Sequence, residues 1–422
     1  MKFSHLLRNP YSVITIAAMF YLYEFFIRVS PSVITNELMR DFQIHAGYLG
    51  FLSSLFYYSY TAMQIPAGLL GDKFGPRKVL IVAALICSVA LLIMANAQQP
   101  LMIGVSRLLI GFACSFGYIG PLMLASKWFA KEKFSMITGF IQALGCVGAT
   151  IGTGPISHIT AAHGWRVVMI YSSIAGAILA ILFAIIVRDK PKGYSEDIPM
   201  SKISETQILK YVLAKKQTWI TGILGFCFWS PIAVFAELWG VNFLMEIHKT
   251  TAPNVSGYII WIWIGIAIGA PLFGWYSNFL CSRKKPIIIG FLLGLISSFG
   301  IVFFHPLNSL IMDFLMFTFG ASASAMVITF GLVNDNNPEN VVGTAIGFNN
   351  MSVILGATIL QPITGFILNL LWDGKIVDSH PVYGLTSYVI SFSILPLFSL
   401  IGLLICIFSL KETNCRRIHE TN

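Results

Sequence analysis

Charged residues are scarce in this sequence. Asp, Glu, Lys and Arg make up only 11% of its 422 residues, whereas 56% are hydrophobic, and the mean hydropathy is +0.77. Soluble domains carry about a quarter charged residues, so a soluble protein of this composition could not cover its surface. The composition therefore predicts an all-α integral membrane protein, in which most side chains face the lipid bilayer or the inside of a helix bundle.

Motifs of catalysis and metal binding are also absent from the sequence. The seven cysteines are scattered, mostly within apolar runs, and never in C-x-x-C spacing, which favours packing roles over disulfides or a metal site. No G-x-S-x-G, Walker-type phosphate loop or H-E-x-x-H occurs. We therefore expect no enzyme, no catalytic or metal-binding residues and no cofactor.

Twelve apolar segments are long enough to cross a bilayer. In the first half they cover residues 11–33, 47–71, 78–96, 100–126, 134–160 and 166–187. In the second half they cover residues 217–243, 256–279, 286–304, 308–333, 341–370 and 382–409. The first segment is too long for a signal peptide, so we expect it to stay in the protein. The segments predict an N-terminal six-helix bundle (1–187), a polar connector (188–216) and a C-terminal six-helix bundle (217–422).

Basic residues lie almost entirely on one side of this predicted topology. If the N-terminus is cytoplasmic, the loops on the other side carry only Arg40, Arg166, Lys249 and Lys375. This asymmetry predicts that both termini and the connector are cytoplasmic. It also accounts for the net charge of +9 without a basic domain, so we expect no nucleic-acid partner.

Two sequence patterns recur in equivalent spans of the two halves. Between the second and third spans of each half, at a constant offset of 206 residues, Gly68, Asp72, Arg77 and Lys78 correspond to Gly274, Asn278, Arg283 and Lys284. In the fifth spans, Gly139-Phe140 corresponds to Gly347-Phe348 at an offset of 208. The agreement of the two offsets indicates a parallel repeat, the arrangement in which substrate binds near mid-membrane between two rocking bundles.

The stretch from Gly68 to Lys78 resembles the most specific motif of the major facilitator superfamily. The family pattern is G-x-x-x-D-R/K-x-G-R/K-R/K, and this chain matches it with Pro76 as one extra position. Arg107 and Gly111 are similar to a second family pattern, R-x-x-x-G, in the fourth span. The resemblance covers nearly the whole chain. It implies a multi-pass transporter that works by alternating access, and it associates Arg107 with proton coupling.

Two further comparisons with this superfamily bear on the substrate. The first span, from Tyr21 to Pro31, is similar to anion–cation symporters and to bacterial nutrient-uptake branches, including phagosomal amino-acid transporters. The fifth span departs from the drug-antiporter pattern G-x-x-x-G-P-x-x-G-G, because Thr150 and Ser157-His158 replace glycines. We therefore expect proton-coupled uptake of a small carboxylate-bearing nutrient, an organic anion or an amino acid, by a monomer in a bacterial inner membrane. The alternatives are proton-driven efflux of drugs or siderophore-like compounds and a receptor that senses without transporting.

Ionisable residues inside the spans are costly to bury and mark functional sites. Glu24 and Arg28 lie four residues apart on one helical face, so they can neutralise each other or act on substrate and proton. We expect Arg28 to bind a substrate carboxylate, and Glu24, Arg107 and Glu237 to balance charge and couple protons. Arg107 needs a partner, such as Glu24, a helix C-terminus or substrate. No basic residue lies within the membrane spans of the half that contains Glu237. If Glu237 has no functional role, we expect its carboxylate to accept hydrogen bonds from serine and tryptophan donors or to lie at the edge of a water-filled cavity.

Polar and aromatic residues complete the predicted site. The remaining substrate-binding candidates are Tyr21, Tyr57, Gln142, Trp229, Asn349 and Asn350. Gln142 and Asn350 are equivalent in the two halves, so their amides could bracket a substrate or make ordinary interhelical hydrogen bonds. A separate group on the cytoplasmic side is predicted to act as a conformational latch without touching substrate: Gly68, Asp72, Gly75, Arg77 and Lys78. We expect Asp72 and Arg77 to form charge pairs there and to meet a neighbouring helix, with residues 340–344 at the start of the eleventh span as one candidate.

Overall fold

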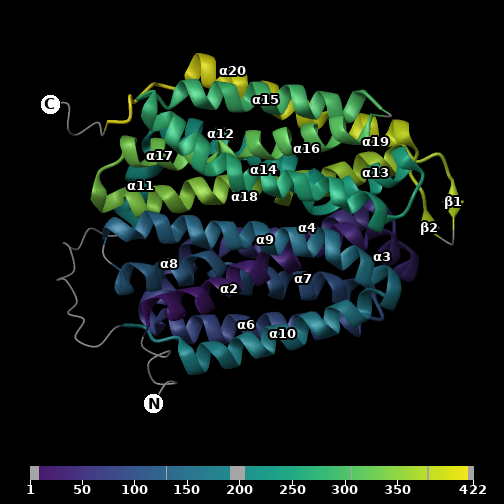
Figure 1. Ribbon diagram of the computed structural model, residues 1–422, viewed down its shortest axis with the longest axis horizontal. Coiled ribbons are helices and arrows are strands. Elements are labelled where there is room, and N and C mark those ends of the chain that lie inside the picture. Colours follow the sequence, from purple (N-terminus) through teal and green to yellow (C-terminus); the bar gives the residue numbers. More distant parts are fainter. Residues whose placement is uncertain (1–8, 130, 191–204, 306, 378–379, 417–422) are drawn as a thin grey trace.

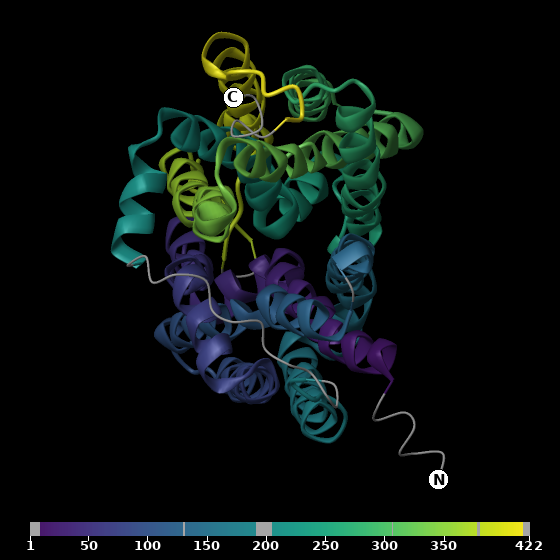
Figure 2. The ribbon, with the colours of Figure 1, turned by 90° about the vertical axis from the view of Figure 1, so that its left-hand side faces the viewer.

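Two layers of long helices build the molecule. A computed structural model describes residues 9–129, 131–190, 205–305, 307–377 and 380–416. The helices of the first half, purple to blue, form one layer, and those of the second half, green to yellow, form the other (Figure 1). Helix α2 begins and helix α20 ends at the same end of the layers, which we call the terminal end; the opposite end is the distal end. Figure 2 views the two layers from the terminal end.

Helices of the first half alternate in direction between the two ends. The first of them, α2, is capped by Asn9, whose side chain accepts a hydrogen bond from the backbone N–H of Tyr11 (3.0 Å). Pro10, the first residue of the helix, is favoured at that position. The elements are α2 (Pro10–Val29), the 3-10 turn η1 (Ser30–Val33), α3 (Thr35–Phe42), α4 (Ala46–Ala62), α5 (Gln64–Phe74), α6 (Pro76–Ala95), α7 (Pro100–Cys114), α8 (Phe116–Trp128), α9 (Lys131–His163) and α10 (Trp165–Ile186).

The second half repeats this order and adds a short hairpin at the distal end. The connector contributes α11 (Glu205–Ala214). The half itself comprises α12 (Lys216–Val234), the π-helical turn η2 (Phe235–Trp239), α13 (Gly240–His248), α14 (Ala252–Phe279), α15 (Lys284–Phe303), α16 (Ser309–Ser324), α17 (Val327–Asn336), α18 (Glu339–Leu370), strands β1 (Ile376–Val377) and β2 (His380–Pro381), α19 (Leu385–Phe392) and α20 (Ile394–Ser409). The two strands pair antiparallel.

Eleven continuous or slightly broken helices in the described chain are long and apolar enough to cross a membrane. The remaining predicted span, 47–71, is divided at Met63 into α4 and α5, and neither piece alone reaches that length. With this divided span, the fold is that of twelve transmembrane helices in two halves.

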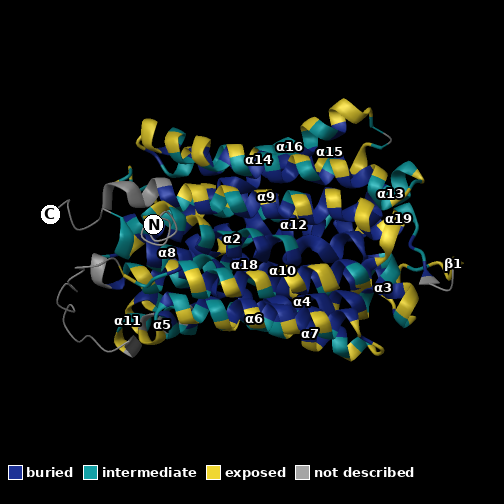
Figure 3. Cartoon of the chain, turned by 60° about the horizontal axis from the view of Figure 1, so that its bottom comes forward, coloured by how far each residue is buried: buried dark blue, intermediate teal, exposed yellow. Residues whose placement is uncertain are grey.

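Large apolar side chains lie on the outward faces of the helices, as a lipid-facing surface requires. Leu310, Phe279 and Phe408 are each at least 70% exposed. Figure 3 shows such exposed positions along the outside of the helices and buried positions between the layers. A soluble protein does not expose so many large apolar side chains, so this distribution agrees with the membrane class predicted from composition.

The two halves are in close contact at the distal end. Helix α4 packs on α18, and α9 packs on α14. A β-carbon built on Gly50 of α4 would lie 2.8 Å from the carbonyl oxygen of Gln361 in α18, so only glycine fits there. Near the terminal end of α18, β-carbons built on Gly343 and Gly347 would meet nothing within 4 Å. Among the described residues, tight backbone contacts between the halves thus lie near the distal end, whereas Gly343 and Gly347 of α18 have open space beside them.

Hydrogen bonds between side chains also join the halves at the distal end. The Thr35 hydroxyl donates to the amide oxygen of Asn242 (2.7 Å), whose Nδ2 donates to Asn36 Oδ1 (3.1 Å). The backbone N–H of Ala46 donates to the Tyr383 hydroxyl (2.9 Å). These contacts must break if the distal end opens.

Candidate functional site

Four charged side chains are buried together between the layers. Glu24, Arg28, Arg107 and Glu237 are each no more than 3% exposed. Glu24 and Arg28 lie on α2, Arg107 lies on α7, and Glu237 lies on the π-helical turn of the second half. With both acids ionised, two carboxylates balance two guanidinium groups, so the cluster is electrically neutral.

Arg28 and Tyr57 of the first half contact Glu237 of the second half in this cluster. The Nη2 of Arg28 lies 3.2 Å from Glu237 Oε1, and its Nη1 lies 4.0 Å from Glu24 Oε1. Its Nε donates to the Tyr57 hydroxyl at 3.4 Å, and that hydroxyl donates to the other oxygen of Glu237. The Nη2–Oε1 approach is an ion pair without the alignment of a hydrogen bond. Glu237 therefore has an oxygen facing Arg28 and an oxygen facing Tyr57, both donors coming from the other half.

This arrangement differs from the local environment predicted for Glu237. The partners of Glu237 are an arginine and a tyrosine, not serine or tryptophan donors. Its side chain is also only 1% exposed, so it does not lie at the edge of a water-filled cavity. The basic partner that its own half lacks comes from α2 of the other half. Sequence reasoning within one half could not find that partner.

Aromatic rings surround the Arg28 guanidinium. The ring centres within 6.0 Å of its central carbon are those of Phe25 (5.0 Å), Tyr57 (5.2 Å), Trp229 (5.8 Å), Tyr60 (5.9 Å) and Phe56 (6.0 Å). Such rings attract a cation through their quadrupoles and exclude water from it. Phe25, Phe56 and Tyr60 were not among the predicted site residues, although their spacing to Arg28 and Tyr57 along α2 and α4 is a signal that could have found them.

Glu24 and Arg107 complete the cluster with few hydrogen bonds. No hydrogen bond of regular geometry reaches either carboxylate oxygen of Glu24, although the Tyr60 side chain lies beside it. A β-carbon built on Gly117 of α8 would collide with Glu24 Oε2, so this glycine leaves room for the carboxylate. Arg107 Nη1 donates to the carbonyl oxygen of Ile27 near the C-terminus of α2 (3.3 Å), and its guanidinium lies 4.8 Å from the Phe56 ring centre. Of the partners considered for Arg107, the structure shows a helix C-terminus.

A π-helical turn presents Glu237 to the other half. The backbone N–H of Gly240 donates to the carbonyl of Phe235, five residues back. A β-carbon built on Gly240 would lie close to that same carbonyl (2.5 Å), so glycine permits the turn. Single π-helical turns insert one residue into a helix, rotate the following side chains, and occur often at functional sites. The sequence pattern did not predict this turn.

The other predicted substrate-binding residues lie in three places: beside the charged cluster, at a contact between the two halves, and on the inner side of α18. The Tyr21 hydroxyl donates to Gln142 Oε1 (3.2 Å), and the Tyr21 ring packs on Phe25 (5.0 Å between centres), which connects this pair to the Arg28 cluster. Asn350 Nδ2 donates to Gln64 Oε1 across the halves (2.7 Å).

Asn349 lies on the inner side of α18, where its Nδ2 donates to Thr329 Oγ1 (2.9 Å) and its Oδ1 is buried without a partner. Trp229 is likewise buried with an unpaired Nε1. The structure therefore brings Trp229, Tyr57 and Tyr21 to the charged cluster, and places Asn349 and Asn350 in separate interhelical contacts.

The predicted latch residues lie at the terminal end of α5 and α6. Gly75 has a φ of +83°, which favours glycine and lets the chain reverse between these helices. Gly68 has open space beside it, and Lys78 is exposed. The side chain of Asp72 lies outside the described residues. The Arg77 backbone N–H donates to Asp189 Oδ1 (2.8 Å), and its Nη2 donates to the Ala184 carbonyl (2.5 Å). Arg77 thus contacts the end of α10 and the connector; of the predicted partner range 340–344, the side chain of Asn340 lies outside the described residues.

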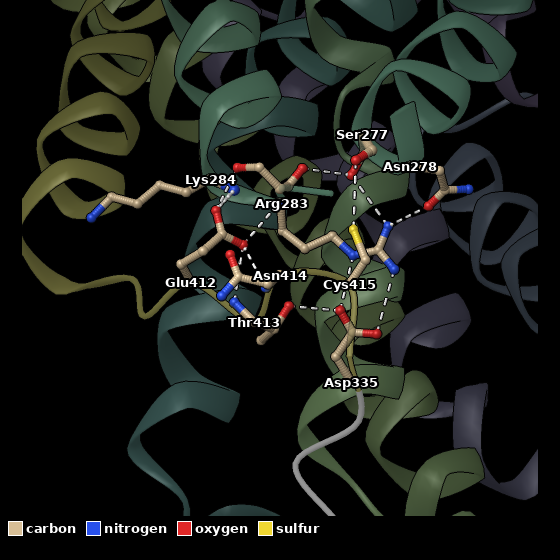
Figure 4. Close-up of polar contacts among 10 residues, drawn as sticks. Ser277, Asn278, Arg283, Lys284, Asp335, Glu412, Thr413, Asn414 and Cys415 are labelled. Carbon is tan, nitrogen blue, oxygen red and sulfur yellow. Dashed lines mark hydrogen bonds and ion pairs between the residues drawn. The ribbon is translucent and has the colours of Figure 1, made fainter. Parts of the chain in front are cut away.

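An equivalent network occupies the same place in the second half (Figure 4). Glu412 accepts hydrogen bonds from the backbone N–H groups of Arg283 (2.8 Å) and Lys284 (3.0 Å) and from Ser282 Oγ (2.5 Å). Arg283 Nε lies 2.9 Å from Asp335 Oδ2. Partial burial alone would raise the pKa of Glu412, but these hydrogen bonds lower it to about 2.

The two networks share one design. Asp189 and Glu412 each lie three residues beyond the last helix of their half, which ends at Ile186 in one and Ser409 in the other. Each carboxylate accepts hydrogen bonds from the first N–H groups of the third-span helix, α6 or α15. Both networks join helices within one half, so they stabilise each half as a unit.

Comparisons with known proteins agree with this architecture. The Major Facilitator Superfamily profile matches residues 14–361. The chain is 23% identical to the probable sulfoacetate transporter SauU of Cupriavidus necator, over 77% of this chain and 76% of that protein. It is 22% identical to the hexuronate transporter of Bacillus subtilis, over 81% of this chain and 84% of that protein. Among solved structures, it is similar to a bacterial homologue of the human lysosomal transporter Spinster in an inward-facing, unoccupied conformation, with a TM-score of 0.77, 15% identity, and coverage of 97% and 98% of the two chains.

Proposed function

The chain belongs to the major facilitator superfamily, and on that premise we propose that it takes up a small carboxylate-bearing nutrient by proton-coupled alternating access. As a member it is a multi-pass membrane transporter. Two of its relatives are named for anions, hexuronate and sulfoacetate, which supports an organic anion as the substrate. An amino acid, which also carries a carboxylate, is the second substrate class to test.

The buried Arg28 between the two halves is the observation that carries this proposal. A guanidinium fork binds a carboxylate through paired donors, and in a site without water that interaction is strong. Arg28 is 2% exposed, is surrounded by aromatic rings, and already contacts a carboxylate from the opposite half. An anion bound at Arg28 would therefore lie between the two bodies whose relative motion transports it.

The charge balance of the cluster supports proton coupling. Glu24 and Glu237 together balance Arg28 and Arg107. Adding an anion to this buried neutral group leaves an uncompensated negative charge, which is costly in an apolar interior. Protonation of one carboxylate restores neutrality, so Glu24 or Glu237 carries the proton that accompanies substrate.

We further propose that the terminal end faces the cytoplasm of a bacterial inner membrane. The excess of Lys and Arg at that end supports this orientation. The tight distal interface and the open space near Gly343 and Gly347 then correspond to a state closed to the outside. Residues 1–187 and 217–422 are the two moving bodies of a monomer, and residues 188–216 connect them.

Uptake into proteoliposomes tests this function. The purified protein is reconstituted and given labelled D-glucuronate, D-glucarate, sulfoacetate and a set of amino acids, with and without an inward proton gradient. We expect an acid to accumulate only with the gradient. Arg28→Ala should lower kcat/KM by roughly 10- to 150-fold, corresponding to ~1.5–3 kcal/mol for hydrogen bonds to a charged group.

The matched control is Arg166→Ala, at the distal surface. Arg166 pairs with Asp41 (2.6 Å) outside the cluster, so its removal should leave uptake unchanged. Equal uptake by Arg28→Ala and wild type would remove Arg28 from the site, and accumulation that ignores the pH gradient would reject proton coupling. Outward movement of substrate under the same gradient would favour efflux, and saturable binding without any movement would favour a receptor.

A further inference from the structure

The Glu237 carboxylate is bound in the way that a substrate carboxylate would be. One of its oxygens faces the Arg28 guanidinium at 3.2 Å, and the other accepts a hydrogen bond from the Tyr57 hydroxyl. Both donors belong to the first half, and they are joined to each other by the Arg28 Nε–Tyr57 hydrogen bond (3.4 Å). Together they form a preorganised carboxylate site whose present occupant comes from the second half.

We propose that Glu237 is an internal ligand, which occupies the carboxylate position on Arg28 and Tyr57 and is displaced by the carboxylate of the substrate. The inference rests on the proposed function, since it names how the same site accepts its anion. Until the anion arrives, Glu237 keeps the buried guanidinium compensated. When the anion arrives, it replaces the ion pair that holds the two halves together at this point.

The displacement conserves charge when one proton enters. The groups that face Glu237 are Arg28 from α2, Tyr57 from α4 and, at longer range, Glu24 from α2 and Arg107 from α7. The substrate brings one negative charge to Arg28, and the released Glu237 carboxylate takes up one proton to become neutral. No covalent bond changes, and the cluster with its substrate stays neutral.

Two features of the structure allow the exchange. The contact between Arg28 Nη2 and Glu237 Oε1 lacks hydrogen-bond alignment, so a mobile carboxylate can make a better bond to the same nitrogen. Glu237 also lies on a π-helical turn, whose hydrogen bonding can return to the regular α-helical pattern with a rotation of its side chains. A change from the π-helical to the α-helical pattern can therefore move Glu237 away from Arg28 without unfolding the helix.

Acetate, the smallest stable carboxylate with an apolar methyl group, provides a test that does not depend on the natural substrate. In Glu237→Ala the internal carboxylate is gone and the Arg28–Tyr57 site is free. We expect acetate to raise the melting temperature of this variant by several degrees relative to the same concentration of chloride, and to leave the wild type unchanged. The double variant Glu237→Ala with Arg28→Ala should lose the acetate effect.

Glu24→Ala is the matched control. It removes a buried carboxylate from the same cluster, but one that lies farther from the Arg28 guanidinium (4.0 Å, against 3.2 Å for Glu237) and has no contact with the Tyr57 hydroxyl. Acetate should not stabilise it. If acetate stabilises Glu237→Ala no more than it stabilises the wild type or Glu24→Ala, the inference is overturned.

Glu237→Ser covers the case in which Glu237→Ala does not fold, because serine keeps a polar group at this position while leaving the carboxylate site on Arg28 and Tyr57 free. Bound acetate is then detected by broadening of its carbon-13 resonance, and greater broadening with Glu237→Ser than with wild type supports the inference. Equal broadening overturns it.

The uptake assay separates this inference from the proposed function. Acetate stabilisation of Glu237→Ala together with no transport of any acid would reject transport while supporting the internal carboxylate site. Transport of an acid that depends on Arg28, with no acetate effect, would support transport and reject the internal ligand.

Discussion

The glycine contact at the distal interface permits a direct test of how the two halves move. In Gly50→Ala the new methyl carbon would lie 2.8 Å from the Gln361 carbonyl oxygen and 3.2 Å from the Pro362 Cα. Ordinary contacts begin at about 3.4 Å, so α4 and α18 must separate by roughly 0.6 Å at this point. The atoms in the way belong to the backbone, which cannot turn aside as a flexible side chain would.

The cost of this overpacking sets the expected effect. Extra methyl groups in a tight contact cost about 1–3 kcal/mol. Because the contact lies between two bodies that move as units, opening the distal end relieves the strain without unfolding either half. We therefore expect the ratio of distal-open to distal-closed protein to rise about 5- to 150-fold, the equivalent of that free energy.

Spin labels on the two halves measure this ratio. Cysteines at the exposed distal positions His163 and Leu310 carry the labels, and serine replaces the exposed native Cys281. Electron–electron distance measurements should show a longer-distance population that grows in Gly50→Ala. Gly257→Ala is the control, since it adds the same methyl group at an exposed position of α14 where nothing lies within 4 Å.

The control also removes the effect of helix propensity. Both substitutions replace a helical glycine with alanine, so both gain about 0.8–1 kcal/mol in intrinsic helix preference. Equal distance distributions in Gly50→Ala and Gly257→Ala would refute the reasoning that the distal glycine contact holds the closed state.

Three further predictions concern the charged cluster and the terminal end. Gly117→Ala should impair uptake severely because its methyl group would displace the Glu24 carboxylate, whereas Gly139→Ala, beside open space, should transport normally; equal uptake rates would contradict this. If one proton accompanies each negative charge, an imposed membrane potential at constant pH should change the initial rate of monoanion uptake less than about twofold, and a strong dependence on potential would show uncompensated charge. Glu412→Gln should lower the free energy of unfolding by about 1 kcal/mol near neutral pH, a value reduced for partial exposure. Because the pKa of Glu412 is lower in the folded protein, this difference should be present above about pH 4.5 and should shrink as the pH falls toward 2, which denaturation curves at several pH values can check.

Much of the fold could be predicted from the sequence because membrane insertion depends on local composition. A span needs about 20 apolar residues whatever lies elsewhere in the chain, so the spans could be counted directly. The break at Met63 could not be predicted in this way, because α4 and α5 together still form one apolar segment. The π-helical turn at Phe235–Trp239 was equally hidden, since its residues are as apolar as their neighbours apart from Glu237.

The candidate site was only partly predictable. Burial makes a charge expensive wherever its partner lies, and this local argument identified Glu24, Arg28, Arg107 and Glu237. Which of them pair is a property of the packed halves. Glu24 is the sequence neighbour of Arg28, but the closer carboxylate is Glu237, at 3.2 Å against 4.0 Å.

The sequence alone determined the membrane class, the internal repeat, the family resemblance and the short set of buried charges, because hydrophobicity, repeat offsets and the cost of burying charge are properties of local segments. The tertiary structure decided that Arg28 joins the halves through Glu237 and Tyr57, that aromatic rings enclose it, and that the distal interface is the tight one. Those features arise only when helices distant in the chain pack together, since a contact between residues of different halves leaves no periodic pattern in either.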